Sequence, residues 1–257
     1  MRLLAVYAIF VVGTAGSGKS TLASALGPWY REKGAHVITV NLDPGVAKLP
    51  YTPDVDVRDY VDLDEIMETY ELGPNGALVF AADLIASKLP ELQDEIESFR
   101  ATYALVDTPG QMELFAYRSS GPYIVENLRC DGRAAIFIFD PGLISTAVNF
   151  VSTALLATSV QLRLGCPQVS VLSKKDLSGH AWKRILRWAS NVQTLTDALA
   201  EESKDQFYLL SKGIVSLMVR TGYSHAIIPT SAVTREGFVE LSATLTRILR
   251  GGEEIEE

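Results

Sequence analysis

Short apolar runs alternate with longer segments of helical periodicity along most of this chain. The apolar runs, which favour strands, are residues 6–12, 37–42, 103–106, 134–139, 169–172 and 226–228. Apolar residues recur at helical spacing between these runs, in residues 20–33, 77–100, 144–164 and 236–249. Because continuous apolar strands need cover on both sides, the pattern predicts an α/β fold with a mostly parallel sheet flanked by helices on both faces.

The domain organisation follows from the same pattern. Residues 177–222 are helical in pattern and separate two motifs described below, so we expect a helical insertion within one domain that spans residues 1–257. The acidic end of the chain, in residues 251–257, predicts a solvated tail. Parallel sheets of this kind bind ligands at the carboxyl ends of their strands, and the motifs with candidate chemistry follow these ends.

Residues 13–20 read G-T-A-G-S-G-K-S, a complete match to the phosphate-loop pattern G-x-x-x-x-G-K-[ST] between a strand and a helix. The glycines let backbone N–H groups converge on phosphate oxygens, and the helix that follows adds its N-terminal dipole. Lys19 is placed to reach the β- and γ-phosphates, and the Ser20 hydroxyl is placed to ligate Mg²⁺. The predicted phosphate-binding residues are Gly13, Gly16, Ser17, Gly18, Lys19, Ser20 and Thr21.

The sequence D-T-P-G-Q, which begins at Asp107, follows the third predicted strand. An aspartate that leaves a buried strand opposite a phosphate loop can hold Mg²⁺ through water. Gly110 offers a free N–H to a γ-phosphate, which predicts a nucleotide-sensing switch, and Gln111 is an uncharged group able to orient a water. The same residues also make a strand-ending turn, but the phosphate loop upstream favours the nucleotide interpretation.

A second aspartate, Asp43 in N-L-D-P, follows the second predicted strand. Its position lets it reach Mg²⁺ or an attacking water from the side opposite Asp107. The alternative is a capping or turn aspartate before a proline. Downstream, Arg58 and Asp59 in D-V-R-D-Y are assigned to the same mobile segment.

Residues 173–176 read S-K-K-D, which resembles the N-K-x-D guanine motif with Ser173 in place of asparagine. Asp176 can accept hydrogen bonds from N1–H and N2–H₂ of guanine, and each such charge-assisted bond is worth about 1.5–3 kcal/mol. The Lys174 stem can lie along the purine face; a charged loop without a ligand is the alternative. S-A-V at residues 231–233 resembles the S-A-x loop whose backbone meets guanine O6. The predicted base-binding residues are Ser173, Lys174, Asp176, Ser231, Ala232 and Val233.

Residues 73–76 read G-P-N-G between two segments of helical pattern. Proline fixes φ, asparagine tolerates left-handed geometry and glycine supplies it outright. Physical chemistry alone therefore predicts a helix–helix turn at this place.

Taken in order, G-T-A-G-S-G-K-S, N-L-D-P-G, G-P-N-G, D-T-P-G-Q, S-K-K-D and S-A-V resemble the motifs of the GPN-loop GTPases, in particular of archaeal members, over about residues 6–250. The resemblance implies a phosphate-loop NTPase of the signal-recognition-particle and MinD-like class that forms two-fold homodimers. It also implies that residues 73–75 reach into the partner's nucleotide site and place Asn75 near the γ-phosphate and Mg²⁺. The predicted catalytic residues are Lys19, Asp43, Asn75, Asp107 and Gln111, and the predicted metal-binding residues are Ser20, Asp43 and Asp107.

The implied function is a homodimeric GTPase that converts GTP and water to GDP and phosphate with Mg²⁺ and changes shape on hydrolysis. The partners we expect are a second copy, through the face that carries residues 73–75, and an unidentified client protein; eukaryotic relatives are implicated in RNA polymerase assembly. The alternatives are a MinD- or ArsA-like ATPase, an assembly scaffold with incidental hydrolysis, a metal-delivery GTPase and a phosphate-loop kinase. S-K-K-D disfavours the ATPase, the lack of a Cys/His cluster disfavours metal delivery, and D-T-P-G-Q with S-K-K-D disfavours the kinase.

The composition of the chain bears on its binding partners, its cysteine chemistry and its location. The formal net charge of −8 gives no electrostatic footprint for nucleic acid, and the hydrophobic content of 47% indicates extra buried surface, such as a subunit interface. Cys130 and Cys166 do not form a C-x-x-C pair, so we expect neither a disulfide framework nor a zinc site. The apolar start leads directly into the phosphate loop, which favours a strand over a signal peptide. We therefore expect a soluble cytoplasmic protein that does not bind membranes.

Overall fold

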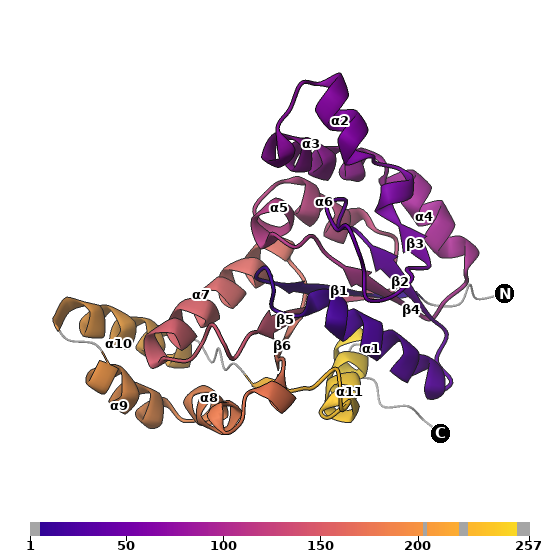
Figure 1. The fold of residues 1–257 in the computed structure, drawn as a ribbon. Coiled ribbons are helices and arrows are strands. Elements are labelled where there is room, and N and C mark those ends of the chain that lie inside the picture. The colour runs from indigo at the N-terminus through magenta and orange to yellow at the C-terminus, as the bar shows by residue number, and fades with distance from the viewer. Residues whose placement is uncertain (1–5, 203–204, 221–225, 251–257) are drawn as a thin grey trace.

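The computed structural model describes residues 6–202, 205–220 and 226–250, and its centre is a seven-stranded sheet (Figure 1). The strands lie in the order β3-β2-β4-β1-β5-β6-β7, and every pairing among the described residues is parallel. Their bounds are β1 Tyr7–Gly13, β2 Val37–Asn41, β3 Val55–Asp56, β4 Tyr103–Asp107, β5 Gly132–Phe139, β6 Gln168–Leu172 and β7 Ile227–Pro229.

Two hydrophobic cores, one on each face of the sheet, explain why β1 is apolar throughout. Successive side chains of a strand point to opposite faces, so Ile9 and Val11 join one core and Phe10 joins the other. The first face is covered by α1 (Lys19–Glu32) and α11 (Phe238–Leu249). The second face is covered by α3 (Pro74–Ser87), α4 (Leu89–Ser98), α5 (Met112–Ala116), α6 (Ser120–Asn127) and α7 (Ala147–Leu164). The predicted α/β fold, with a parallel sheet between two helical layers, is confirmed.

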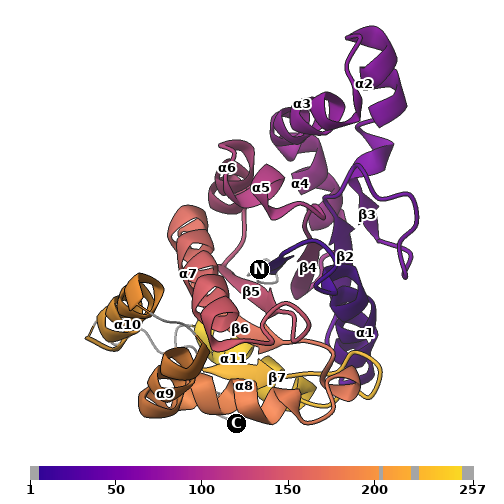
Figure 2. The same ribbon diagram turned by 60° about the vertical axis from the view of Figure 1, so that its left-hand side comes forward.

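The described part of the segment expected to be a helical insertion contains three helices beside α7 (Figure 2). They are α8 (Ala181–Ser190), α9 (Val192–Glu202) and α10 (Asp205–Arg220), and both α9 and α10 pack on α7. The assignment of this segment as an insertion within one domain stays a prediction. The acidic tail predicted at residues 251–257 lies outside the described residues. None of the helices in the described part of the chain combines the length and apolar character needed to cross a membrane.

One sequence-based expectation about the elements was wrong, and several short elements were not predicted. Residues 77–100 were expected to form one helix, but the chain breaks at Lys88 between α3 and α4, because Pro90 lacks the N–H that a continuous helix needs. The two-residue strand β3 was not predicted, since it is too short for any periodicity to show. The short helices α5 and α6 were missed for the same reason.

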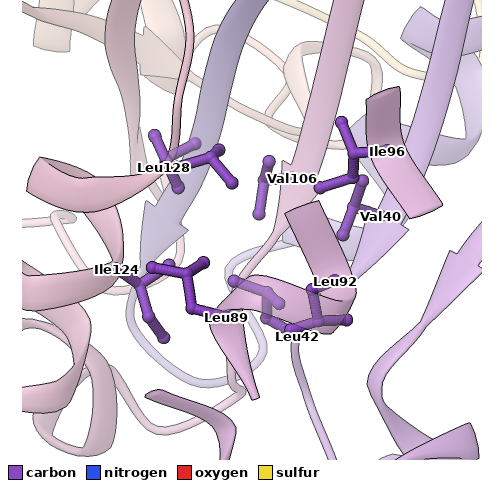
Figure 3. A pocket seen from close by; sticks show the side chains of 9 residues that line it. Val40, Leu42, Leu89, Leu92, Ile96, Val106, Ile124 and Leu128 are labelled. Carbon is purple, nitrogen blue, oxygen red and sulfur yellow. The ribbon is translucent and has the colours of Figure 1, made fainter. Parts of the chain in front are cut away.

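A small apolar cavity lies between the sheet and helices α4 and α6 (Figure 3). Its lining residues come from β1, β2, β4, the two helices and the positions directly after β2 and α6; they are Phe10, Val40, Leu42, Leu89, Leu92, Ile96, Val106, Ile124 and Leu128. All of these side chains are hydrocarbon, so the lining offers no side-chain group that could bind a phosphate or a base. The cavity is therefore a feature of core packing, and the candidate site lies elsewhere, at the carboxyl ends of the strands.

Candidate nucleotide-binding site

The phosphate loop connects the carboxyl end of β1 to the first turn of α1, as the sequence predicts. Gly18 is the N-cap residue of α1 and has φ of 101°, a left-handed conformation that is strained for any residue with a Cβ. At Gly13 a Cβ would lie 2.8 Å from Ser17 Oγ and 3.2 Å from Ile138. Both glycines are therefore required for the loop to curl closely over the strand.

Lys19 joins the phosphate loop to the D-T-P-G turn. Its side chain is buried, and its Nζ donates to the carbonyl oxygens of Gly13 at 3.0 Å, Thr14 at 3.1 Å and Gly110 at 3.0 Å. An ammonium group has three donors, so all three are used. Burial lowers the pKa of Lys19, although nearby carboxylates oppose the shift. The ammonium group is thus held where the two predicted phosphate-sensing segments meet.

Asp107 ends β4 beside β1, with Val11 as its Cα partner, and is almost completely buried. Its carboxylate accepts hydrogen bonds from the Ser20 hydroxyl and, at Oδ2, from the Tyr51 hydroxyl at 3.1 Å. Burial raises the pKa of Asp107 to about 6, although the hydrogen bonds from Ser20 and Tyr51 oppose the shift. The structure therefore brings together two of the three predicted metal-binding residues.

The oxygen atoms at this place fit a magnesium ion. Among the described residues, the buried Oδ1 of Asp107 has no hydrogen-bond partner, and the Ser20 hydroxyl bonds the same carboxylate. Mg²⁺ takes oxygen ligands and is usually held by one or two carboxylates together with phosphate oxygens and waters. Ser20, Asp107 and, on the neighbouring strand end, Asp43 are residues of this kind.

Asp43 contacts the D-T-P-G turn directly, which corrects one expectation. Its Oδ2 accepts a hydrogen bond from the Gly110 N–H at 2.8 Å, and its Oδ1 accepts one from the Gly45 N–H at 2.9 Å. The Gly110 N–H, expected to be free, is therefore occupied in this structure. The cause is topological: β2 and β4 are neighbours, with Asn41 opposite Asp107, so the two loops that leave these strands lie side by side.

The S-K-K-D segment is tied to the phosphate loop. Ser173 is buried, and its Oγ donates to the Ser17 carbonyl at 2.9 Å. Lys174 has φ of 54°, and its Nζ donates to the Gly16 carbonyl and to Oδ2 of Asp140, both at 2.8 Å. The Lys174 ammonium therefore reaches back over the phosphate loop. The replacement of asparagine by serine at residue 173 keeps one donor, and this donor is used inside the protein.

The two predicted base-binding loops lie next to each other. The Lys175 N–H donates to the Thr230 carbonyl at 3.0 Å, and the Lys175 ammonium pairs with Glu236 at 2.5 Å. The same ammonium lies over the Trp182 ring, 4.6 Å from its centroid. Asp176, in the 3₁₀ turn η2 (Lys175–Leu177), is exposed. Its carboxylate is thus accessible to a ligand that enters beside these loops.

The S-A-V loop begins at a fully buried serine. Ser231 Oγ accepts a hydrogen bond from the Thr234 N–H at 3.0 Å, which fixes the turn. Ala232 is half-buried and Val233 is exposed, so the backbone of these two residues borders solvent beside the S-K-K-D segment. The S-A-V loop follows Thr230, whose carbonyl accepts a hydrogen bond from the Lys175 N–H, and its contact with a base stays a prediction.

Asn75 and Gln111, like Lys19, are predicted catalytic residues that lie at helix starts. The G-P-N segment is the beginning of α3 rather than a loop: Gly73 is the N-cap residue, and Pro74 and Asn75 form the first turn, because proline is well suited to the first helical position. Asn75 is exposed, and its side chain has no hydrogen bond within the part of the chain that is described. Figures 1 and 2 show α3 and its neighbour α2 (Leu63–Thr69) well apart from α1. Gln111 is the exposed N-cap residue of α5.

Sequence reasoning missed two polar residues of the site. Asp140 directly follows the predicted strand at residues 134–139, so its position at a strand end was a usable signal. Tyr51 lies in the connection between β2 and β3, where no periodicity or motif indicated a contact with Asp107.

Comparison with known proteins identifies one matching family and several similar proteins. Residues 11–251 match the family described as "Conserved hypothetical ATP binding protein". The chain is 36% identical over 237 residues to GPN-loop GTPase PAB0955 of Pyrococcus abyssi, covering 91% of this chain and 93% of that protein. It is 30% identical over 251 residues to GPN-loop GTPase 3 of Dictyostelium discoideum, covering 96% and 88%. The crystal structure of PAB0955, described as a GTPase in apo form, superposes with a TM-score of 0.84 at 33% identity over 94% of this chain and 97% of that one.

Proposed function

The chain belongs to the GPN-loop GTPase family, and we propose that it binds GTP with Mg²⁺ and hydrolyses it to GDP and phosphate. The observation that carries this proposal is the position of the Lys19 ammonium, which bonds carbonyl oxygens of both the phosphate loop and Gly110. A cation at this junction can contact the terminal phosphates and the switch segment together. The two carboxylates beside it, Asp43 and Asp107, supply the acidic residues that phosphoryl transfer with a metal requires.

Phosphate binding follows from the chemistry of the loop. Phosphate oxygens would replace the carbonyl oxygens as acceptors for the Lys19 ammonium. The new hydrogen bonds would be stronger, because both the donor and the acceptor carry a charge. The backbone N–H groups around Gly16 and Gly18, at the start of α1, would accommodate the remaining charge. Mg²⁺, held by Ser20 and Asp107, would neutralise the negative charge that develops on the phosphate oxygens.

Asp43 and Gly110 give a physical basis for a switch. A γ-phosphate oxygen near the Gly110 N–H competes with the Asp43 carboxylate, which accepts that hydrogen bond at 2.8 Å. Once the N–H turns to the phosphate, Asp43 is released to accept a proton or to orient a water, together with Gln111. Loss of the γ-phosphate after hydrolysis would let the Asp43–Gly110 bond form again.

Guanine is the base that this site favours. Asp176 is exposed beside the S-A-V loop, and a carboxylate accepts hydrogen bonds but donates none. Guanine presents donors at N1 and N2, whereas adenine presents an acceptor at N1. The description of the matching family as ATP-binding and the names of the GPN-loop relatives point to different bases. We choose GTP on the chemistry of Asp176, and a MinD- or ArsA-like ATPase is the alternative.

We also propose a homodimer in which Asn75 of each chain completes the nucleotide site of its partner. Asn75 is exposed, lacks a side-chain hydrogen bond within the described residues, and begins a helix that lies apart from the phosphate loop of its own chain. An amide in that position is available to a second molecule.

The role we infer for this dimer is assembly of a larger complex around a client protein. The surface feature that favours a protein partner is a group of exposed apolar side chains on α10, namely Phe207, Leu209 and Leu210.

The first test is nucleotide binding and turnover by the purified chain. We expect Mg²⁺-dependent GTP binding and hydrolysis, with ATP bound at least about tenfold more weakly because Asp176 meets an acceptor in adenine. Lys19→Ala should weaken GTP binding by at least about 100-fold, since several charge-assisted bonds are lost together. Lys33→Ala removes an equally charged but exposed side chain at the end of α1 and should leave binding unchanged. Equal affinity for ATP and GTP, or normal GTP binding by Lys19→Ala, would contradict the proposal.

A further inference from the structure

We propose that Asn41 is a positioning residue that holds Asp43 against the D-T-P-G turn, with Asp56 and Arg58 as its anchor. The inference deepens the proposed function, because it assigns a support to the residue expected to act on the attacking water or the metal. It starts from a buried amide that no motif assignment uses.

Asn41 is enclosed between two neighbouring strands. It is the last residue of β2, it is completely buried, and its Cα partners are Asp56 on β3 and Asp107 on β4. A buried amide that lacks partners is costly, and its hydrogen bonds therefore fix its orientation. Asn41 thus occupies the point where the strand under Asp43 ends and the loop begins.

The Asn41 amide contacts both backbone polar groups of Asp43. Oδ1 of Asn41 accepts a hydrogen bond from the Asp43 N–H at 3.0 Å, and Nδ2 donates to the Asp43 carbonyl at 3.1 Å. Nδ2 also donates to Oδ1 of Asp56 at 2.9 Å. The main chain of Asp43 is therefore clamped by one side chain, whose own orientation is set by Asp56.

Arg58 holds Asp56 and a second point of the loop that contains Asp43. Its Nε lies 3.0 and 3.1 Å from the two carboxylate oxygens of Asp56, its Nη2 bonds the same carboxylate, and its Nη1 donates to the Val46 carbonyl at 3.0 Å. Burial alone would raise the pKa of Asp56, but the hydrogen bonds from Arg58 and Asn41 outweigh it and lower that pKa. Asp56 thus stays a carboxylate, and the loop is fixed at Asp43 and at Val46.

The consequence is a defined direction for the Asp43 carboxylate. With its main chain clamped, its two oxygens meet the N–H groups of Gly45 and Gly110 at 2.9 and 2.8 Å. The bonds from Asn41 are to the main chain of Asp43, so they remain when a γ-phosphate takes the Gly110 N–H and the carboxylate turns to the water. A catalytic carboxylate has to be held within about 0.5 Å of its working position, and such precision comes from the groups behind it. Asn41 acts on the reaction through Asp43 and does not touch the nucleotide itself.

The same strand provides a matched control. Thr39 lies two residues before Asn41 on β2, is also buried, and its Oγ1 donates to Oδ2 of Asp54 at 2.9 Å. This bond likewise joins β2 to the segment that leads into β3, but it does not involve Asp43. Thr39→Val and Asn41→Leu each replace a buried polar side chain by an apolar one of similar size. A purely structural role of Asn41 predicts similar effects of both changes.

The first experiment compares steady-state kinetics. Asn41→Leu should lower kcat for GTP by about 10- to 100-fold, because small displacements of a catalytic group cost rates of this size. Its KM for GTP and its affinity for GDP should stay within about twofold of wild type, since the phosphate loop is unchanged. Thr39→Val should leave kcat within about twofold of the wild-type value, even if it lowers the thermal unfolding midpoint as much as Asn41→Leu does. An equal fall of kcat in both variants, or none in Asn41→Leu, would overturn the inference.

A second readout does not depend on hydrolysis. In nucleotide-free protein labelled with ¹⁵N-glycine, Asn41→Leu should speed hydrogen exchange of the Gly110 amide by about tenfold, because loss of one hydrogen bond is worth about that factor. Thr39→Val should leave this exchange unchanged. If wild type hydrolyses no GTP, the proposed function fails while this measurement still decides the role of Asn41. Unchanged exchange at Gly110 in Asn41→Leu would refute the positioning role even in an active GTPase.

Discussion

The Tyr51 hydroxyl donates a hydrogen bond to Oδ2 of Asp107 at 3.1 Å, across 56 residues of sequence. Burial raises the pKa of Tyr51 above its usual range, and the negative charge of Asp107 adds to this shift, so the phenol stays protonated and remains a donor. One oxygen of the Asp107 carboxylate is thereby fixed, while the buried Oδ1 has no partner among the described residues. Tyr51 thus orients the carboxylate that we expect to hold magnesium.

Tyr51→Phe should raise the Mg²⁺ concentration needed for half-maximal GTP binding by about tenfold, because removal of a group that orients a metal-binding residue commonly costs this much. Titration of Mg²⁺ against a fluorescent GTP analogue measures the change. Tyr60→Phe is the matched control, because the Tyr60 hydroxyl also bonds a carboxylate, Glu95 at 2.6 Å, in a pair that includes no predicted site residue. Equal magnesium midpoints for Tyr51→Phe and wild type would show that the contact with Asp107 does not matter for binding.

Asp176→Asn should shift base preference from GTP toward XTP. Xanthine carries a carbonyl where guanine carries its 2-amino group, and an asparagine amide can donate to that carbonyl. One charge-assisted hydrogen bond of about 1.5–3 kcal/mol makes a change of at least about tenfold in the GTP/XTP affinity ratio. Competition binding with both nucleotides gives the ratio, and Asp197→Asn on α9 serves as a surface control. An unchanged ratio would mean that Asp176 does not read the base.

Asp107→Ala and Gln111→Ala should separate binding from turnover. Asp107→Ala should weaken Mg²⁺-dependent GTP binding, because it removes a metal-binding carboxylate next to Ser20. Gln111→Ala should leave binding within about twofold and slow turnover by about 100-fold, as expected for a group that acts on the transition state. Gln193→Ala, an exposed glutamine on α9, controls for nonspecific effects. Wild-type turnover in Gln111→Ala would assign the attacking water to another residue, with Asp43 the first candidate.

The sequence identified those parts of the site that are contiguous in the chain. The phosphate loop, the D-T-P-G turn and S-K-K-D can each be recognised from a few consecutive residues. Each of them also follows a strand that is visible in the sequence as a run of apolar residues. The sequence could not identify side-chain pairs between distant segments, such as Tyr51 with Asp107 and Asn41 with Asp56. These pairs depend on the strand order β3-β2-β4. The bond between Asp43 and Gly110, which overturned the expectation of a free N–H, has the same origin.

The break at Lys88 has a different cause, because Pro90 is visible in the sequence and periodicity alone ignored it. Helical spacing continues through the break, since both α3 and α4 bury apolar residues against the same core. The backbone N–H that Pro90 lacks interrupts the helix even though the helical spacing of apolar residues continues. The chain turns at Lys88 and starts a new helix there.

Asn75→Ala should bind GTP within about twofold of wild type and hydrolyse it about 10²- to 10³-fold more slowly, the usual cost of losing one preorganised polar group at a transition state. Binding depends on the phosphate loop and base loops of the same chain, whereas Asn75 is exposed and begins a helix apart from them. Ser87→Ala, a change of an exposed residue at the end of α3, controls for the helix itself.

Subunit mixing tests whether Asn75 acts in the partner's site. Asn75→Ala chains have an intact nucleotide site, and Lys19→Ala chains have an intact Asn75, so a heterodimer of the two combines one working site with one working asparagine. Activity should rise toward half that of wild type per heterodimer formed, although each variant alone is nearly inactive. The measurement requires that native mass spectrometry detect the heterodimer, because recovery depends on its abundance. Heterodimers that form but stay as slow as Asn75→Ala would mean that Asn75 acts within its own chain or only begins α3.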